Sequence, residues 1–155
     1  MWNFVVNYWI LIAKDHNYDG SIVSAITIIK NRVEHKFWIL NKNTPGIKRL
    51  KPGDKAVFYA ASFEGKGFCG WGELSTEPHP LTPDQRFYAF GKPSMLFDFA
   101  VDFKIAEFWP KLKPIEKLAS ALSFLKDKSN YIRCFRGSIR AITQEDFEHI
   151  ISAQV

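Results

Sequence analysis

The pattern of apolar and polar residues predicts a chain built mainly from strands. Residues 4–13 are apolar at almost every position, which is typical of a strand buried on both faces. Residues 97–105 instead alternate apolar and polar side chains, which predicts a strand with one buried face. Asp98 and Asp102 fall on the polar face of that strand, and we expect them to face solvent.

Residues 49–74 predict a hairpin. The Pro-Gly-Asp sequence at 52–54 favours a turn, because proline presets one backbone torsion and glycine accepts a positive φ. Residues 56–61 have the length and apolar character of a buried strand, and residues 68–74 return beside it. Glycines inside that second strand indicate a close approach of another backbone segment, as at a barrel corner. We therefore expect the hairpin to be the spine of a small closed β-structure.

Three segments predict helices. Ser21 is expected to cap a helix that runs to about Arg32, although its many β-branched residues leave a strand possible. Pro114 suits a first helical turn, and apolar residues follow it at 115, 118, 122 and 125. Thr143 opens a sequence typical of a capping box, which predicts the terminal helix.

The remaining segments predict short strands and loops. Residues 36–40 have the pattern of a short strand, and a polar basic loop follows at 41–49. Residues 131–135 are predicted to form the last strand. Residues 75–95 contain four prolines and are rich in loop signals. Long loops within one domain often carry function. The whole pattern predicts an α+β fold in a single domain over residues 1–155.

Charge is distributed unevenly along the chain. The net charge is +5, and residues 30–55 carry eight basic and two acidic side chains. Residues 111–140 again carry eight and two, whereas residues 76–110 carry three basic and five acidic ones. A polyanionic partner and an ordinary solvated lysine surface explain this distribution equally well.

The motifs of common enzyme and metal-binding classes are missing. The four histidines are scattered, the two cysteines form no C-x-x-C pair, and the sequence has neither a Walker loop nor a nucleophile elbow. We therefore expect no catalytic group, no metal and no cofactor. Two unpaired thiols are typical of a reduced cytoplasmic protein. The apolar N-terminal run is too short for a membrane span.

Aromatic residues close to basic ones predict a binding site. Trp38 can stack on a nucleobase, Asn41 can hydrogen-bond the base edge, and Lys42 can contact a phosphate. Spacing alone favours a core position for Trp38. Further aromatic side chains on the proline-rich segment form either a second wall or a hydrophobic plug: Phe87, Tyr88 and Phe90. Candidate phosphate contacts, for which solvated surface positions are the equal alternative, are Lys42, Lys48, Arg133, Arg136 and Arg140.

Together these motifs resemble the EVE domain, a family of the PUA-like β-barrel superfamily. The resemblance rests on Tyr8-Trp9-Ile10, on Trp38 before a basic loop, and on LKPGDKAVFY and FCGWGEL in the hairpin. The sequence around Phe68-Cys69-Gly70 is also similar to the related YTH domains, which read N6-methyladenosine in RNA. The resemblance implies a mixed β-barrel with peripheral helices that accepts one modified base of DNA or RNA.

The resemblance also implies which residues form the base pocket. Trp38 falls where YTH-type domains place a cage tryptophan, with a second wall from the aromatic residues at 87–90. Many EVE domains carry Lys-Ser-Glu-Pro after the first strand, where this chain has Ile12-Ala13-Lys14-Asp15. The base preference of relatives therefore does not transfer. We expect Trp38→Ala to reduce binding severely and to leave the fold intact.

Two other functions stay open at this point. One is an accessory domain of an enzyme that modifies or processes RNA. The other is a module for small molecules or proteins in which Trp38 is structural. The first predicts turnover, and the second predicts that oligonucleotides do not bind in a salt-dependent way.

Overall fold

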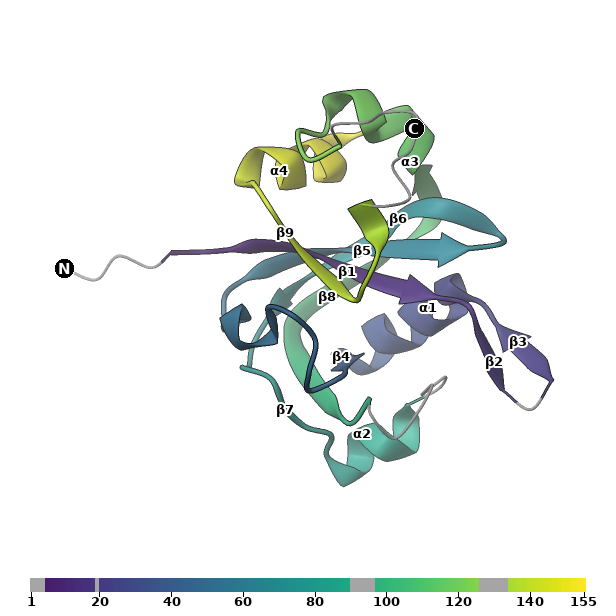
Figure 1. The fold of residues 1–155 in the computed structure, drawn as a ribbon, viewed down its shortest axis with the longest axis vertical. Coiled ribbons are helices and arrows are strands. Elements are labelled where there is room, and N and C mark those ends of the chain that lie inside the picture. Colours follow the sequence, from purple (N-terminus) through teal and green to yellow (C-terminus); the bar gives the residue numbers. More distant parts are fainter. Residues whose placement is uncertain (1–4, 19, 90–96, 126–133) are drawn as a thin grey trace.

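The main element of the computed structural model is one curled, mixed sheet, which forms a half-barrel (Figure 1). The structure describes residues 5–18, 20–89, 97–125 and 134–155. The strand order is β4-β8-β6-β5-β1-β9, with β7 beside β8. The sheet strands are β1 (Tyr8–Lys14), β4 (Phe37–Leu40), β5 (Lys55–Ser62), β6 (Gly65–Leu74), β7 (His79–Pro80), β8 (Phe99–Pro114) and β9 (Ile139–Ile142). A separate hairpin pairs β2 (His16–Tyr18) with β3 (Ser21–Val23).

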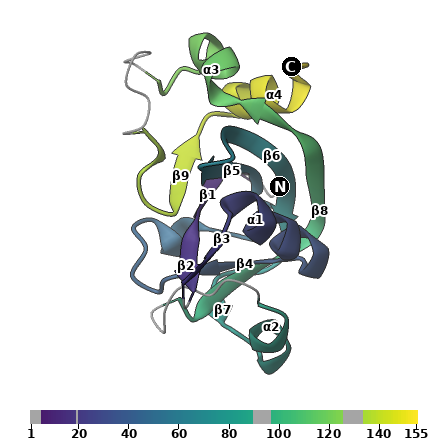
Figure 2. The same ribbon diagram turned by 90° about the vertical axis from the view of Figure 1, so that its right-hand side faces the viewer.

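The helices cover the two faces of this sheet. Figure 2 shows α1 within the curl of the sheet, and α3 and α4 together on the other face. Their bounds are α1 (Ala25–His35), α2 (Pro83–Tyr88), α3 (Ile115–Leu118) and α4 (Gln144–Ser152). Short 3-10 turns lie at Ile47–Arg49 and Ala119–Ala121. The predicted α+β architecture with peripheral helices is therefore confirmed.

β1 lies in the interior of the sheet, as its continuous apolar pattern predicts. It pairs in parallel with β5 and antiparallel with β9. Its alternate residues enter two apolar clusters, because successive side chains of a strand point to opposite faces. Leu11 packs in the cluster inside the curl, which also contains Phe58 and residues of α1. Ile10 packs in the cluster under α3 and α4.

The predicted hairpin is the pair β5 and β6. A buried carboxylate anchors the turn that precedes β5. Asp54 is 1% exposed and accepts hydrogen bonds from the Asn7 and Lys51 backbone N–H groups and from the Trp9 indole N–H. The predicted close backbone approach is confirmed at Gly70, where a Cβ would lie 2.4 Å from the carbonyl oxygen of Glu107. The expected closed structure is instead an open path from β4 to β9 over the described residues.

The sequence predicted the bounds or the type of some elements wrongly. Helix α1 is capped by Ser24, whose hydroxyl accepts from the Thr27 N–H, whereas Ser21 lies in β3. The segment predicted as loop contains α2, which a full capping box begins at Thr82. Residues 134–135 form a helical turn and residues 131–133 lie outside the described part of the chain, while the last described strand is β9.

The alternation in β8 is confirmed for its first half and then fails. Val101 and Phe103 are buried, whereas Ile105 is 43% exposed. The register of β8 against β6 shifts between Glu73 and Leu74, and this shift turns the following side chains. Asp102 is not simply solvent-facing, since its carboxylate contacts the His79 ring at 2.9 Å and accepts from the Gln85 amide. It therefore ties α2 to the sheet.

Candidate functional site

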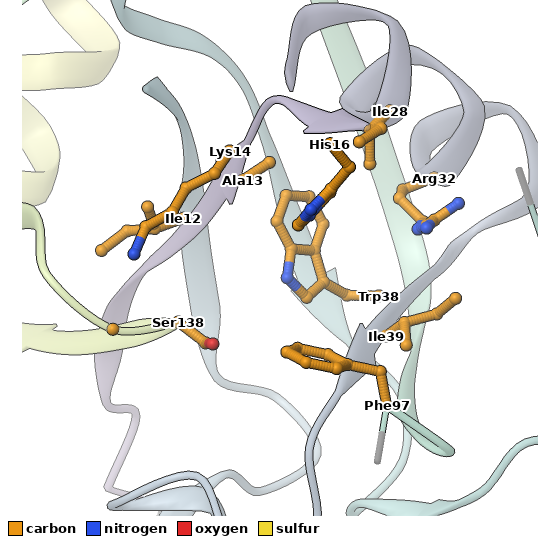
Figure 3. A pocket seen from close by; sticks show the side chains of 11 residues that line it. Ile12, Ala13, Lys14, His16, Ile28, Arg32, Trp38, Ile39, Phe97 and Ser138 are labelled. Carbon is orange, nitrogen blue, oxygen red and sulfur yellow. The ribbon is translucent and has the colours of Figure 1, made fainter. Parts of the chain in front are cut away.

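A small cavity of about 150 Å³ opens between β1, α1 and β4 (Figure 3). Its apolar walls come from β1, α1, β4 and Phe97, which precedes β8, and its polar side includes Lys14, His16 and Ser138. The residues Ile12, Ala13 and Lys14 belong to the run that replaces Lys-Ser-Glu-Pro of many EVE domains. The residues at which this chain differs from many EVE domains therefore line the cavity.

Trp38 belongs both to the core and to the cavity wall. It is 3% exposed, and its ring stacks on Phe58 with centroids 5.0 Å apart and planes 20° apart. Trp38 also lines the cavity, as does Phe97 (Figure 3). Truncating a core tryptophan to alanine costs about 3–5 kcal/mol of stability. The expectation that Trp38→Ala leaves the fold intact is therefore revised.

The indole nitrogen of Trp38 is an unused donor. Figure 3 shows it on the edge of the ring that faces Ile12 and Ser138. Within the described residues, no hydrogen bond joins this N–H to an acceptor. The cavity thus combines aromatic surface with a free N–H group and the Ser138 hydroxyl. Such a site suits a flat ring whose edge carries hydrogen-bond acceptors.

The charged lining of the cavity is basic. Arg32 is 3% exposed, its Nη1 donates to Asn31 Oδ1 at 2.6 Å, and its guanidinium lies 5.7 Å from the centre of the Phe37 ring. The pKa of His16 is lowered chiefly by burial and also by the positive charges of Arg32 and Lys14, against the effect of Asp15. His16 is therefore neutral at pH 7 and acts there as a hydrogen-bonding group. The described lining contains no carboxylate.

The size of the cavity restricts what can enter it. An engineered apolar cavity of about 150 Å³ binds benzene. Drug-sized ligands occupy pockets of about 300–1,000 Å³. The volume here matches a single aromatic ring, and a larger ligand would have to extend out of the cavity.

The other described residues that were predicted for the base pocket lie elsewhere. The Asn41 side chain accepts from the Asn43 backbone N–H at 2.8 Å and so shapes its own loop. Phe87 is 83% exposed on α2, and Tyr88, which is 48% exposed, stacks on His35 at 4.5 Å. None of these three residues lines the cavity. Phe90 lies outside the described residues.

The predicted phosphate contacts are spread over the molecule. Lys42 and Lys48 line a second, wider hollow of about 460 Å³. Arg136 is exposed next to Gly137, which lines the first cavity. The Arg140 guanidinium packs 5.0 Å from the centre of the Phe124 ring, and its Nη1 lies 3.5 Å from the Cys134 carbonyl oxygen. Arg133 lies outside the described residues.

Sequence reasoning missed several lining residues. The alternation pattern identified Phe97 only as part of a buried strand face, and nothing in the spacing linked it to Trp38. Lys14 had one signal, which was its place in the run that departs from other EVE domains. His16, Arg32 and Ser138 had none, because they reach the cavity from three separate segments.

Three further features concern metals, membranes and thiols. In the described part of the chain, no three His, Cys, Asp or Glu side chains gather as a metal site would require. Over the same residues, no helix is long and apolar enough to cross a membrane. Cys69 and Cys134 are both free thiols.

Comparison with known proteins yields a family and a fold. The model of the EVE domain matches residues 7–153. A UPF0310 protein of Pyrococcus abyssi is 28% identical over 158 residues, which cover 95% of this chain and 99% of that protein.

The solved structures that resemble this one are distant in sequence. The human THYN1 protein in complex with DNA containing 5-methylcytosine has a TM-score of 0.60 at 19% identity, over 94% of this chain and 96% of that one. The N-terminal domain of Staphylothermus marinus McrB has a TM-score of 0.55 at 16% identity, over 95% and 94%. At these identities the likeness shows the fold alone, and the predicted α+β architecture of a mixed, curled sheet with peripheral helices is confirmed.

Proposed function

The chain belongs to the EVE domain family, and we propose that it binds nucleic acid by enclosing one modified base in the Trp38 cavity. The observation that carries the proposal is the cavity itself, which has the volume of one aromatic ring and is lined by Trp38 and Phe97. The human THYN1 protein, which shares the fold, has been crystallised with DNA containing 5-methylcytosine.

Binding would proceed by extrusion of the base from its stack. Extrusion costs a few kcal/mol, which stacking on aromatic side chains in the protein offsets. Trp38 is already held by Phe58, so little rotamer freedom is lost when a base arrives. The Trp38 N–H, the Ser138 hydroxyl and the Lys14 ammonium group would donate to acceptors on the base edge.

The basic surface would hold the backbone of the strand. Lys42, Lys48 and Arg136 are exposed and remain the proposed phosphate contacts. Contacts of this kind supply affinity without sequence preference and weaken as salt rises. Arg140 is less suited to this role, because its guanidinium already packs on Phe124.

The test is a binding panel at two salt concentrations. We would measure affinities for DNA and RNA strands that carry 5-methylcytosine, N6-methyladenine or no modification. Phe97→Ala is expected to weaken binding of the preferred strand by about tenfold or more, because it removes a stacking surface. The matched control is Phe87→Ala, an aromatic residue that is 83% exposed and does not line the cavity.

The same panel separates the competing functions. Equal binding of modified and unmodified strands, or loss of binding in Phe87→Ala but not in Phe97→Ala, would contradict the proposed cavity. Conversion of the strand to a new product would indicate an enzyme or its accessory domain. The absence of salt-dependent binding would favour a module for small molecules or proteins.

A further inference from the structure

We propose that the second hollow binds the nucleotide adjacent to the base in the Trp38 cavity, so that the domain contacts two successive nucleotides of one strand. This inference rests on the proposed function. The hollow has a volume of about 460 Å³ and is lined by the loop after β4, the segment before β7 and the start of β8. That volume falls in the range of pockets that bind small organic ligands.

The hollow has both parts that a nucleotide requires. Phe99, Ile47 and Pro78 supply apolar surface, and the Phe99 ring offers a face for a base. Lys42, Lys48 and Lys51 supply ammonium groups for a phosphate. The Asn43 amide, which also lines the hollow, can donate to and accept from a base edge.

Residues that are close together in the sequence line the two sites. Trp38 and Ile39 line the first cavity, and Lys42 lines the second just beyond the end of β4. Phe97 and Phe99 likewise line one site each and are two residues apart. A chain cannot span more than about 3.6 Å per residue, so their Cα atoms lie within about 7 Å of each other. One nucleotide step of an unstacked strand can bridge the two walls.

Charge favours a phosphate in this hollow. Lys51 Nζ bonds Glu77 Oε1 at 2.7 Å, so these two charges offset each other. The Lys51 hydrogen bond lowers the pKa of Glu77, which is therefore ionised at neutral pH. Lys42 and Lys48 are exposed, and no described carboxylate forms an ion pair with either. The hollow thus has a net positive charge, which an acidic peptide would also satisfy. The aromatic wall, and lining residues that lie close in sequence to those of the first cavity, favour a nucleotide.

The first experiment measures salt dependence. The probe is a single-stranded heptanucleotide with 5-methylcytosine at its centre and thymidine on both sides. In Lys42→Gln/Lys48→Gln, the magnitude of the slope of log K against log salt is expected to decrease by about 0.7, which is the contribution of one phosphate contact on a single strand. The matched control is Lys66→Gln/Lys117→Gln, which removes the same charge from exposed lysines that line neither site and should keep the wild-type slope.

The second experiment tests stacking on Phe99. Phe99→Leu keeps an apolar side chain against the core and removes the aromatic face. It is expected to weaken binding of the heptanucleotide by about tenfold. If one of the two thymidines next to 5-methylcytosine is replaced by an abasic residue, Phe99→Leu should lose this effect, because the base that stacks on Phe99 is then absent.

The outcomes separate this inference from the proposed function. If Phe97→Ala abolishes the preference for 5-methylcytosine while the lysine variant keeps the wild-type slope, the adjacent-nucleotide site and the phosphate contacts of Lys42 and Lys48 are wrong, and the base cavity of the proposed function stands. A second outcome is that the slope decreases in magnitude while Phe99→Leu weakens binding equally for the intact strand and for the two strands with an abasic residue on one side of 5-methylcytosine. In that case the hollow only attracts anions, and the inference is overturned. A heptanucleotide that does not bind at low salt overturns both.

Discussion

Trp9 and Trp38 are tryptophans on strands of the same sheet, 1% and 3% exposed, and their surroundings differ in one respect. The Trp9 indole N–H donates to Asp54 Oδ2 at 2.9 Å, and the Arg49 guanidinium lies 5.2 Å from the centre of its ring. The Trp38 ring stacks on Phe58 and also borders a cavity, with its N–H lacking an acceptor in the described part of the chain.

This difference separates the scaffold from the proposed binding site. Around Trp9, the buried Asp54 carboxylate accepts from three donors, so burying its charge is compensated. Around Trp38, the indole N–H has no acceptor among the described residues, and the ring borders the cavity. This N–H therefore stays available to the proposed ligand, whereas the Trp9 N–H is used to stabilise the fold.

The largest effect on stability is expected from a substitution in the scaffold around Trp9. Asp54→Ala removes the shared acceptor of the Asn7, Lys51 and Trp9 N–H groups. We expect a loss of about 3–5 kcal/mol in the free energy of unfolding, because three donors lose their acceptor and each unpaired buried donor costs about 1–3 kcal/mol. Urea unfolding measures it. Glu64→Ala, an exposed carboxylate in the β5–β6 turn, should change stability by less than about 0.5 kcal/mol. Similar losses in both variants would show that Asp54 does not anchor the turn.

A paired substitution sharpens the comparison. Trp9→Phe removes a hydrogen bond to a buried carboxylate, whereas Trp38→Phe removes no hydrogen bond among the described residues. Both lose similar apolar surface. Hydrogen bonds to charged groups contribute about 1.5–3 kcal/mol. We therefore expect Trp9→Phe to lose about 2 kcal/mol more stability than Trp38→Phe in the same urea titration. Equal losses would mean that the two tryptophans have equivalent roles.

A smaller effect is expected from His16 at the cavity. Burial lowers its pKa in the folded protein below the ordinary value of 6.5, so the unfolded chain binds this proton at higher pH than the folded one. The contribution of His16 to stability is complete above pH 6.5 and is lost as pH falls through the lowered folded pKa. Unfolding of the wild type and His16→Gln at pH 7.5 and at pH 5 measures this. The wild type should lose more stability on acidification, and parallel losses would contradict the assignment.

The smallest effect concerns the thiols, and it requires no substitution. Burial raises the pKa of Cys69 to about 12, so its thiolate is scarce at pH 8. Cys134 is only half-buried. A thiol reagent such as DTNB at pH 8 should modify Cys134 in the native protein and reach Cys69 only on unfolding. Rapid modification of both thiols would indicate that the scaffold around β6 opens readily.

The patterns that predicted the fold are local ones. The continuous apolar run of β1, the Pro-Gly-Asp turn and the Thr143 cap each depend on neighbouring residues, and each is present in the structure. The start of α1 was predicted three residues early, because Ser21 and Ser24 are both good capping residues. Pairing of residues 21–23 with β2 decides between them.

The sequence by itself determined that this chain forms an α+β domain of the EVE family with an aromatic residue before a basic loop. It did not determine which aromatic residue lines the cavity together with Trp38. Phe87 and Tyr88 are aromatic residues that would suit a pocket wall, yet α2 carries them away from the cavity, and Phe97 in the segment before β8 lines it. Only the tertiary structure decided this. The cavity forms where β1, α1, β4 and the segment before β8 converge, and no local spacing encodes where segments so distant in sequence meet.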